Sequence, residues 1–172
     1  MADELDYIEQ DNAPQRPKYL KVLCILSFIS TGAGLVSSFF SLLGGPASED
    51  EMLEEKVEIT KSINELSSMG MDGMSDLLVK IQAMTEQIND NFYFASIVAL
   101  ITVGIGFFGV LKMWKGFKVG FHLYIVYCLL SIGGLYLYVS PSNIPSVIVI
   151  FNLLFSGLFV LMYSKNLHWM TK

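Results

Sequence analysis

The chain has 172 residues, of which 53% are hydrophobic and only 16% are charged, and its mean hydropathy is +0.53. Because an average soluble domain carries about 25% charged residues, this composition is typical of a chain that faces lipid. The net charge of −5 argues against nucleic acid as a partner.

The first predicted elements are a cytoplasmic acidic tail over residues 1–19 and a transmembrane helix over residues 20–43. The apolar run of this helix exceeds the roughly 20 residues that cross a hydrocarbon core about 30 Å thick. It is also longer than the apolar region of a cleaved signal peptide, which spans about 7–15 residues, and an acidic segment precedes it. We therefore interpret residues 20–43 as a retained helix.

Residues 44–91 are predicted to form an acidic helical hairpin between the first two spans. Gly44, Gly45 and Pro46 end the first span, and Ser48 followed by Glu51 has the spacing of a capping box at a helix start. Apolar residues then recur at close to heptad spacing in two stretches. They are Met52, Ile59, Ile63 and Leu66, and then Met74, Leu77, Ile81, Met84 and Ile88.

Two helices of about 20 residues would make this hairpin about 30 Å long at a rise of about 1.5 Å per residue. Its apolar seam is thin, so we expect it to need support from the bundle, from another copy or from a partner. No Pro or Gly lies between Asp76 and Ala95, which allows the second hairpin helix to continue into the second span as one rod. Whether the hairpin stands upright or folds down is left open by the sequence.

Three more apolar runs are predicted to cross the membrane, over residues 92–111, 119–139 and 145–163. A basic turn, a short outer loop and a C-terminal tail complete the chain, at residues 112–118, 140–144 and 164–172. The predicted fold class is therefore all-α, a four-helix transmembrane bundle with an extracytoplasmic helical hairpin between helices 1 and 2.

The placement of lysine and arginine predicts the orientation of the bundle, because short cytoplasmic segments carry an excess of both. The basic residues beside the spans are Arg16, Lys18, Lys21, Lys112, Lys115, Lys118, Lys165 and Lys172. By contrast, residues 140–144 carry no charge, and residues 44–91 hold three lysines against eleven acids. Four crossings put every basic cluster on one side, so both termini are predicted to be cytoplasmic in an inner membrane.

The turn of the hairpin is the predicted docking surface for a protein partner or for a second copy of the chain. Methionine adapts to varied partners, and Met69, Met71 and Met74 crowd this turn, flanked along the helices by Ile63 and Leu77. Clustered thioethers can also hold Cu(I), but no Cys or His lies near them in the sequence, so we predict no metal here.

Small or amide side chains inside the spans predict where the helices pack together, because small side chains let backbones approach and amides bond across helices. The residues singled out are Gly34, Ser38, Gly104, Gly106, Gly109 and Asn152. Whether these faces seal one four-helix unit or join copies stays open.

The sequence shows no pattern of a catalytic site. It contains no HExxH or GxSxG motif and no pair of intramembrane aspartates, and its two histidines are His122 and His168. Cys24 and Cys128 lie in apolar runs and are interpreted as small membrane-embedded side chains. We predict no enzyme activity, no cofactor and no metal.

A resemblance rests on two stretches of the sequence. The first is a basic and then apolar start before the acidic segment, "RPKYLKVLCILSFISTGAGLV", and the second is the turn between the second and third spans, "GVLKMWKGFKVGFHLY". In these stretches the chain resembles small four-span proteins of Bacteroidota-type bacteria that have no assigned activity. The resemblance covers most of the chain and implies a bacterial cytoplasmic membrane, but it brings no catalytic or binding residues.

The predicted function is that of a non-enzymatic membrane protein, an interaction or accessory subunit of a membrane complex that recognises partners through the hairpin and the small-residue faces of the spans. Its predicted partners are the lipid bilayer and a protein partner or a second copy of the chain. The alternative is a small transporter or channel, whose polar path would involve Asn152, Thr102, Ser131 and His122. The sequence alone does not name the partner or the substrate.

Overall fold

The structure is a computed structural model that describes residues 16–171, so residues 1–15 of the predicted acidic tail and Lys172 lie outside the described residues. Every regular element in the described part is helical, which confirms the all-α prediction. The α-helices are α2 (Lys18–Gly44), α3 (Glu49–Ser68), α4 (Asp72–Asp90), α5 (Phe92–Trp114), α6 (Lys118–Gly133) and α7 (Ser146–Ser164), and the short 3-10 helices are η1 (Gly134–Leu137) and η2 (Pro141–Asn143).

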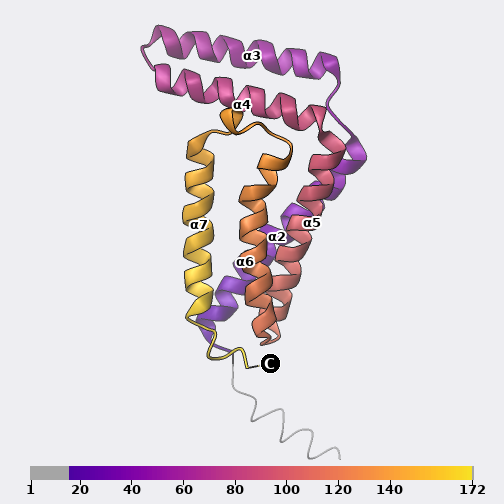
Figure 1. Cartoon of the computed structure of the whole chain (residues 1–172), viewed down its shortest axis with the longest axis vertical. Helices are drawn as coiled ribbons and strands as arrows, with labels where there is room; N and C mark the ends of the chain where they lie inside the picture. Colours follow the sequence, from indigo (N-terminus) through magenta and orange to yellow (C-terminus); the bar gives the residue numbers. More distant parts are fainter. Residues whose placement is uncertain (1–15, 172) are drawn as a thin grey trace, which may run out of the picture.

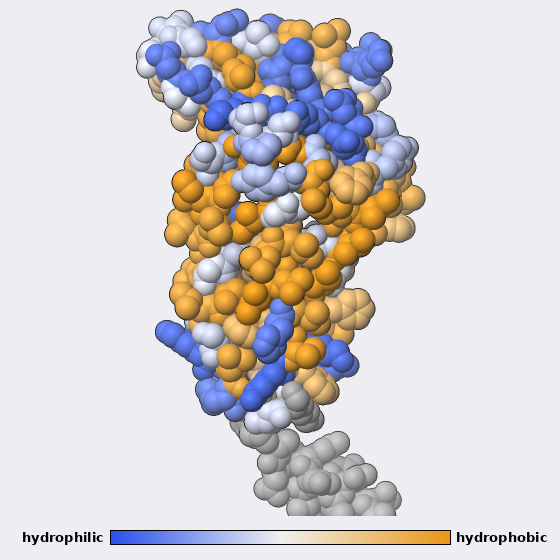
Figure 2. All heavy atoms as spheres, viewed as in Figure 1, coloured by the Kyte–Doolittle hydropathy of each residue, from blue (hydrophilic) through white to orange (hydrophobic). Residues whose placement is uncertain are grey.

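Four of these elements are long and apolar enough to cross a membrane: α2, α5, α6 together with η1, and α7. Figure 2 shows hydrophobic residues over the middle of the molecule, with hydrophilic residues gathered on α3 and α4 and at the opposite end. Four long apolar helices therefore stand where the four spans are predicted, which is compatible with a multi-pass membrane protein. The predicted basic turn is shorter than expected, because α5 continues through Lys112 to Trp114.

The start of α2, the α5–α6 turn and the C-terminal segment meet at one end of the bundle (Figure 1). There the Arg16 guanidinium lies 3.7 Å from the centre of the Trp114 ring and donates to the Trp114 carbonyl at 2.7 Å. Gly116, with φ of 83°, reverses the chain and leaves room for the Trp169 ring. The basic segments beside the spans therefore share this end.

The core is concentrated in the half of the bundle next to that end. Its buried side chains come from all four spans and from the segment after α7, and they are Leu20, Leu23, Cys24, Val110, Met113, Phe121, Tyr124, Cys128, Tyr163 and Met170. By contrast, α7 is bare along most of its length, since Tyr163 is the single buried residue within the fully described range Ser146–Ser164. The side chains of the bundle are thus closely packed at the end with the termini, whereas α7 has few buried contacts with the other spans.

At the other end, α3 and α4 lie side by side across the top of the bundle, with α4 next to the spans and α3 outside it (Figure 1). The capping box predicted at Ser48 and Glu51 is present, and Lys56 of α3 bonds Glu86 of α4 at 2.9 Å. Residues 81–89 of α4 are all partly buried, whereas α3, fully described, has no buried residue. Within this chain, α4 thus packs on the end of the bundle, which is one of the three supports expected for the thin seam.

The continuous rod expected from the absence of Pro and Gly is wrong. Helix α4 ends at Asp90, and the chain turns at Asn91, whose φ of −107° and ψ of 26° are not helical, before α5 begins at Phe92. The Asn91 amide donates to the carbonyls of Gln87 at 2.9 Å and Tyr138 at 3.5 Å. The bend at Asn91 therefore lies beside a loop that is distant in the sequence, and neither Pro nor Gly marks it in the local sequence.

Amide side chains of α4 fasten the hairpin to the bundle. Gln87 donates to the Ser140 hydroxyl at 3.3 Å and accepts from the Ser140 backbone N–H at 2.8 Å. Asn89 accepts from the Ala47 N–H at 2.8 Å and donates to the Ala47 carbonyl at 3.2 Å. The α6–α7 loop and the α2–α3 linker are thus both tied to one stretch of α4.

Replacing Gln87 and Asn89 together with alanine is expected to loosen the hairpin while leaving the spans folded. The four lost hydrogen bonds are exposed to water, and each contributes about 1 kcal/mol or less. Double electron–electron resonance measures the distance between spin labels at positions 71 and 147, in a background with Cys24 and Cys128 replaced by alanine. The distribution of this distance should be broader in the double variant. Gln82→Ala is the matched control, because the Gln82 amide bonds only Glu86 of the same helix. An unchanged distribution in the double variant would contradict the fastening role.

Candidate functional site

The predicted docking residues lie at the turn of the hairpin. Met69, Met71 and Met74 are exposed, with 66%, 41% and 55% of their surfaces accessible. Ile63 and Leu77 are half-buried behind them, where the buried Ser75 hydroxyl bonds the Ile63 carbonyl at 3.3 Å and Ser67 at 3.0 Å. The structure therefore brings all five residues to one end of the hairpin, three facing outward and two supporting the turn.

The outward side of α3 combines acids with apolar side chains. Leu53 and Val57, one helical turn apart, are 61% and 48% exposed, and Glu49, Asp50 and Glu51 occupy the first turn. Acids near a helix N-terminus are stabilised by the helix dipole. This side offers a partner a negative surface with apolar points of contact.

Two carboxylates of the hairpin have a lowered pKa. Hydrogen bonds from the backbone N–H and then the hydroxyl of Ser48 hold the pKa of Glu51 below its ordinary value. A hydrogen bond from the Lys56 ammonium does the same for the pKa of Glu86, against a smaller opposing effect of burial. Because each pKa is lower in the folded state, the stability that each group contributes is present above the unfolded pKa of about 4.3 and is lost as the pH falls through the lower folded pKa.

We expect acidification below about pH 4.3 to fray the start of α3 first. Protonation removes the charge that strengthens both bonds from Ser48 to Glu51, so the amide protection factors of residues 49–52, measured by hydrogen exchange, should fall between neutral and acidic pH. Glu51→Gln keeps a neutral accepting side chain that does not titrate, so its protection should fall less with pH, through Glu49 and Asp50 of the same turn. Wild-type protection that stays constant down to pH 3 would be the contrary result.

The residues predicted to pack helices have different environments. A Cβ added at Gly106 would lie 2.7 Å from the Tyr127 ring, one at Gly109 would lie 3.0 Å from the Tyr124 backbone N, and one at Gly34 would lie 3.2 Å from Val103. At Gly104 an added Cβ meets nothing within 4 Å. Ser38 is half-buried beside a shallow hollow between α2 and α5, below the hairpin.

Sequence reasoning missed the tightest of these contacts, at Gly120. An added Cβ there would lie 2.5 Å from the Gly109 carbonyl oxygen and 2.5 Å from the Met113 N. Gly120 of α6 therefore lies against the backbone of α5, and Gly109 faces it. The available signal was weak, because Gly120 stands at the edge of the basic turn and outside any run of small residues.

A cleft of about 480 Å³ opens between α2, α6 and α7. It is closed on the side of the termini, where the Tyr163 hydroxyl of α7 donates to the Ser27 hydroxyl of α2 at 2.9 Å. The lining residues are Leu26, Ser27, Ser30, Thr31, Tyr124, Tyr127, Cys128, Ser131, Phe151, Asn152, Phe155, Ser156 and Phe159. None of them is charged, and the cleft lies near the middle of the three spans.

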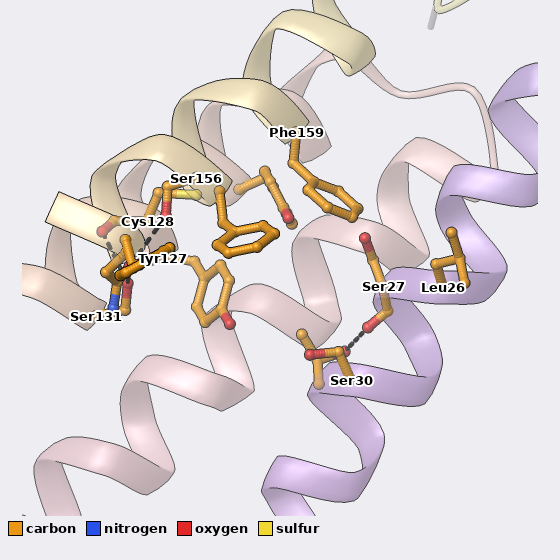
Figure 3. A pocket seen from close by; sticks show the side chains of 13 residues that line it. Leu26, Ser27, Ser30, Tyr127, Cys128, Ser131, Ser156 and Phe159 are labelled. Carbon is orange, nitrogen blue, oxygen red and sulfur yellow. Dashed lines mark hydrogen bonds between the residues drawn. The ribbon is translucent and has the colours of Figure 1, made fainter. Parts of the chain in front are cut away.

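Two groups of polar side chains face each other across this cleft (Figure 3). On one side, the Asn152 Oδ1 accepts from the Ser156 hydroxyl at 3.1 Å and lies 3.5 Å from the Ser131 hydroxyl of α6, whose hydrogen is shared with the Cys128 carbonyl at 2.9 Å. On the other side lie Ser27 and Ser30 of α2. Asn152 thus ties helices together as the sequence predicts, and it also lines a cavity.

The four residues of the predicted polar path do not come together. Asn152 and Ser131 line the cleft, whereas Thr102 is buried on α5 and does not line it. His122 lies on the exposed side of the first turns of α6, with its Nδ1 3.1 Å from the Lys118 carbonyl oxygen. The arrangement provides a half-open polar recess, and His122 lies outside it.

Sequence reasoning also missed the hydroxyl groups of Tyr127, Ser27 and Ser156 as members of this site. The only signal was the spacing of Ser27, Ser30 and Thr31 on α2, which places them on one helix face. No protein-family model, curated protein or solved structure matches the chain.

Proposed function

We propose that the chain is a non-enzymatic accessory subunit of a membrane complex and that it recognises a protein partner through the hairpin. The observation that carries the proposal is the layering at this end of the molecule. Helix α4 is held by the bundle and by α3, whereas α3 has no buried residue along its described length. A helix that is covered by its own chain only on the side facing α4, and that rests on a fixed support, is suited to contact another protein on its outer side.

The partner surface that complements this hairpin is basic with apolar side chains. The hairpin segment carries eleven acids against three lysines, which steer a positively charged partner toward it. Leu53, Val57 and the exposed methionines of the turn supply the apolar contacts that complementary charge alone does not.

A photo-crosslinking residue at Met71 tests this proposal in cells. We expect it to capture one distinct protein that a matched crosslinker at Leu161 does not capture, because Leu161 is 64% exposed on a membrane-spanning helix. Leu53→Lys should reduce the capture by disturbing the α3 surface without touching the turn. Capture of the chain itself alone would make the assembly a homo-oligomer, and equal yields of the same products at both positions would contradict the proposal.

We also propose that both termini are cytoplasmic and that the membrane is the inner membrane of a bacterium. The support is the gathering of Arg16, Lys18, Lys112, Lys115 and Lys118 at one end, opposite the acidic hairpin. A fluorescent-protein fusion at residue 172 should fluoresce, because that reporter folds in the cytoplasm, whereas an alkaline phosphatase fusion there should be inactive. The reverse pair of results would overturn this orientation.

The second candidate function is a small transporter or channel. The cleft beside Asn152 favours it, because a polar recess in a membrane bundle is a feature of substrate paths. Asn152→Leu should then abolish a solute flux into vesicles that contain the purified protein, while the variant still folds. Equal flux in wild type and variant would count against transport through this recess.

A further inference from the structure

We infer that the cleft between α2, α6 and α7 is a binding site for an uncharged membrane lipid that carries carbonyl oxygens. This inference is independent of the hairpin and of any protein partner. It rests on how the cleft opens, on which hydrogen-bonding groups in it lack a partner, and on the shape of its walls.

The cleft is accessible from the bilayer. Its rim is formed by Leu26 of α2 and by Phe151 and Phe155 of α7, which are 50%, 56% and 60% exposed. The bond between Tyr163 and Ser27 closes it toward the end with the termini. A molecule that enters therefore comes sideways from the lipid, and the volume of about 480 Å³ falls within the roughly 300–1,000 Å³ of ligand pockets in general.

Each of the three helices contributes a hydrogen-bond donor that has no partner within residues 16–171. These donors are the Ser30 hydroxyl of α2, the Tyr127 hydroxyl of α6 and the Asn152 Nδ2 of α7, whose Oδ1 is already used by Ser131 and Ser156. Hydrocarbon tails offer no acceptor, so unmatched donors at this depth are costly. A ligand that presents acceptor oxygens removes this cost.

The chemistry of the lining selects the class of ligand. None of the 13 lining side chains is charged, so a charged headgroup would be left without a counter-ion in a medium of low dielectric constant. Carbonyl oxygens match donors of this kind without adding charge. The acceptors must therefore belong to a neutral lipid.

Neutral lipids with carbonyl groups include isoprenoid quinones, which have a flat ring, and acylglycerols such as diacylglycerols, which do not. Five aromatic rings line the cleft, namely Tyr124, Tyr127, Phe151, Phe155 and Phe159. Aromatic side chains pack favourably against other flat rings. The walls therefore favour the quinone ring, whose two carbonyl oxygens can accept from donors on opposite sides of the cleft (Figure 3).

The test uses the full chain in detergent micelles and titrates a short-tailed menaquinone and, separately, dioleoylglycerol, with bound lipid counted by native mass spectrometry. We expect saturable binding of one quinone per chain. Tyr127→Phe, Ser30→Ala and Asn152→Leu should each weaken it about five-fold, and the triple variant about 100-fold, as expected for lost neutral hydrogen bonds. Each variant must elute as wild type in size-exclusion chromatography.

Matched controls are Tyr136→Phe and Ser37→Ala, which remove the same hydroxyl groups from exposed positions outside the cleft; their affinities should equal that of wild type. Preferred binding of dioleoylglycerol, weakened by the same three variants, would support the carbonyl site and assign it to a glycerolipid. Two results would overturn the inference: no saturable binding of either lipid, or binding that none of the three variants weakens.

Discussion

Gly120→Ala is expected to destabilise the bundle by about 3 kcal/mol, at the upper end of the cost of inserting atoms into a packed interface. The added Cβ would lie 2.5 Å from both the Gly109 carbonyl oxygen and the Met113 N, which are backbone atoms of α5. Backbone cannot turn aside as the end of a flexible side chain can. The two helices must therefore separate, and the core residues on both sides of the contact lose packing.

The measurement is the free energy of unfolding in mixed micelles, obtained by titration with a denaturing detergent. The matched control is Gly157→Ala on α7, where an added Cβ meets nothing within 4 Å; it should unfold as wild type does or slightly later, because alanine favours the helix. Gly120→Ala with wild-type stability would show that α5 and α6 are not in backbone contact.

The other large effect is expected for Tyr163→Ala, at about 4 kcal/mol, because truncating a buried aromatic side chain leaves a cavity. Tyr163 has no exposed surface, packs edge-on against Tyr124 with ring centres 5.0 Å apart, and bonds Ser27 at 2.9 Å. It is also the single buried residue of the fully described α7. Its loss releases the end of α7 from α2 and α6.

Thiol labelling of Cys24 reports this release, because Cys24 is buried in the same cluster as Tyr163. In a Cys128→Ala background, a small maleimide should label Cys24 much faster in Tyr163→Ala than in the parent. Tyr163→Phe isolates the hydroxyl: an interhelical hydrogen bond in a membrane contributes about 0.6 kcal/mol on average, so labelling should rise only slightly. Equally slow labelling in all three proteins would mean that Tyr163 does not hold α7.

The spans and the capping box at Ser48 could be predicted because their signals are local. An apolar run of sufficient length, or a serine followed by a glutamate at the third position, determines its own structure whatever lies nearby. The bend at Asn91 was not predictable in this way. The bend lies beside contacts with residues far away in the sequence, since the Asn91 amide donates to the Tyr138 carbonyl and Gln87 accepts from Ser140.

The packing glycines show the same limit. The spacing of small residues says that a helix face is narrow, but it does not say whether another backbone lies against it. Gly104 fits the spacing and faces open space, whereas Gly120 lies outside the pattern and touches α5. The polar cleft could not be predicted either. A serine in a span usually bonds a carbonyl of its own helix, as Ser131 does with Cys128, so its presence in the sequence does not indicate a polar site between helices. Only packing brings such groups from three helices together.

The attachment of Gln87 to Ser140 has a consequence for the whole molecule. Ser140 lies in the loop that leads through η2 into α7, and α7 forms one wall of the cleft. On the proposed function, a protein bound to the hairpin would act through this loop on the first turn of α7, which forms a wall of the recess. Any such coupling between the bound protein and an occupant of the recess would be reciprocal, each changing the affinity for the other by the same factor.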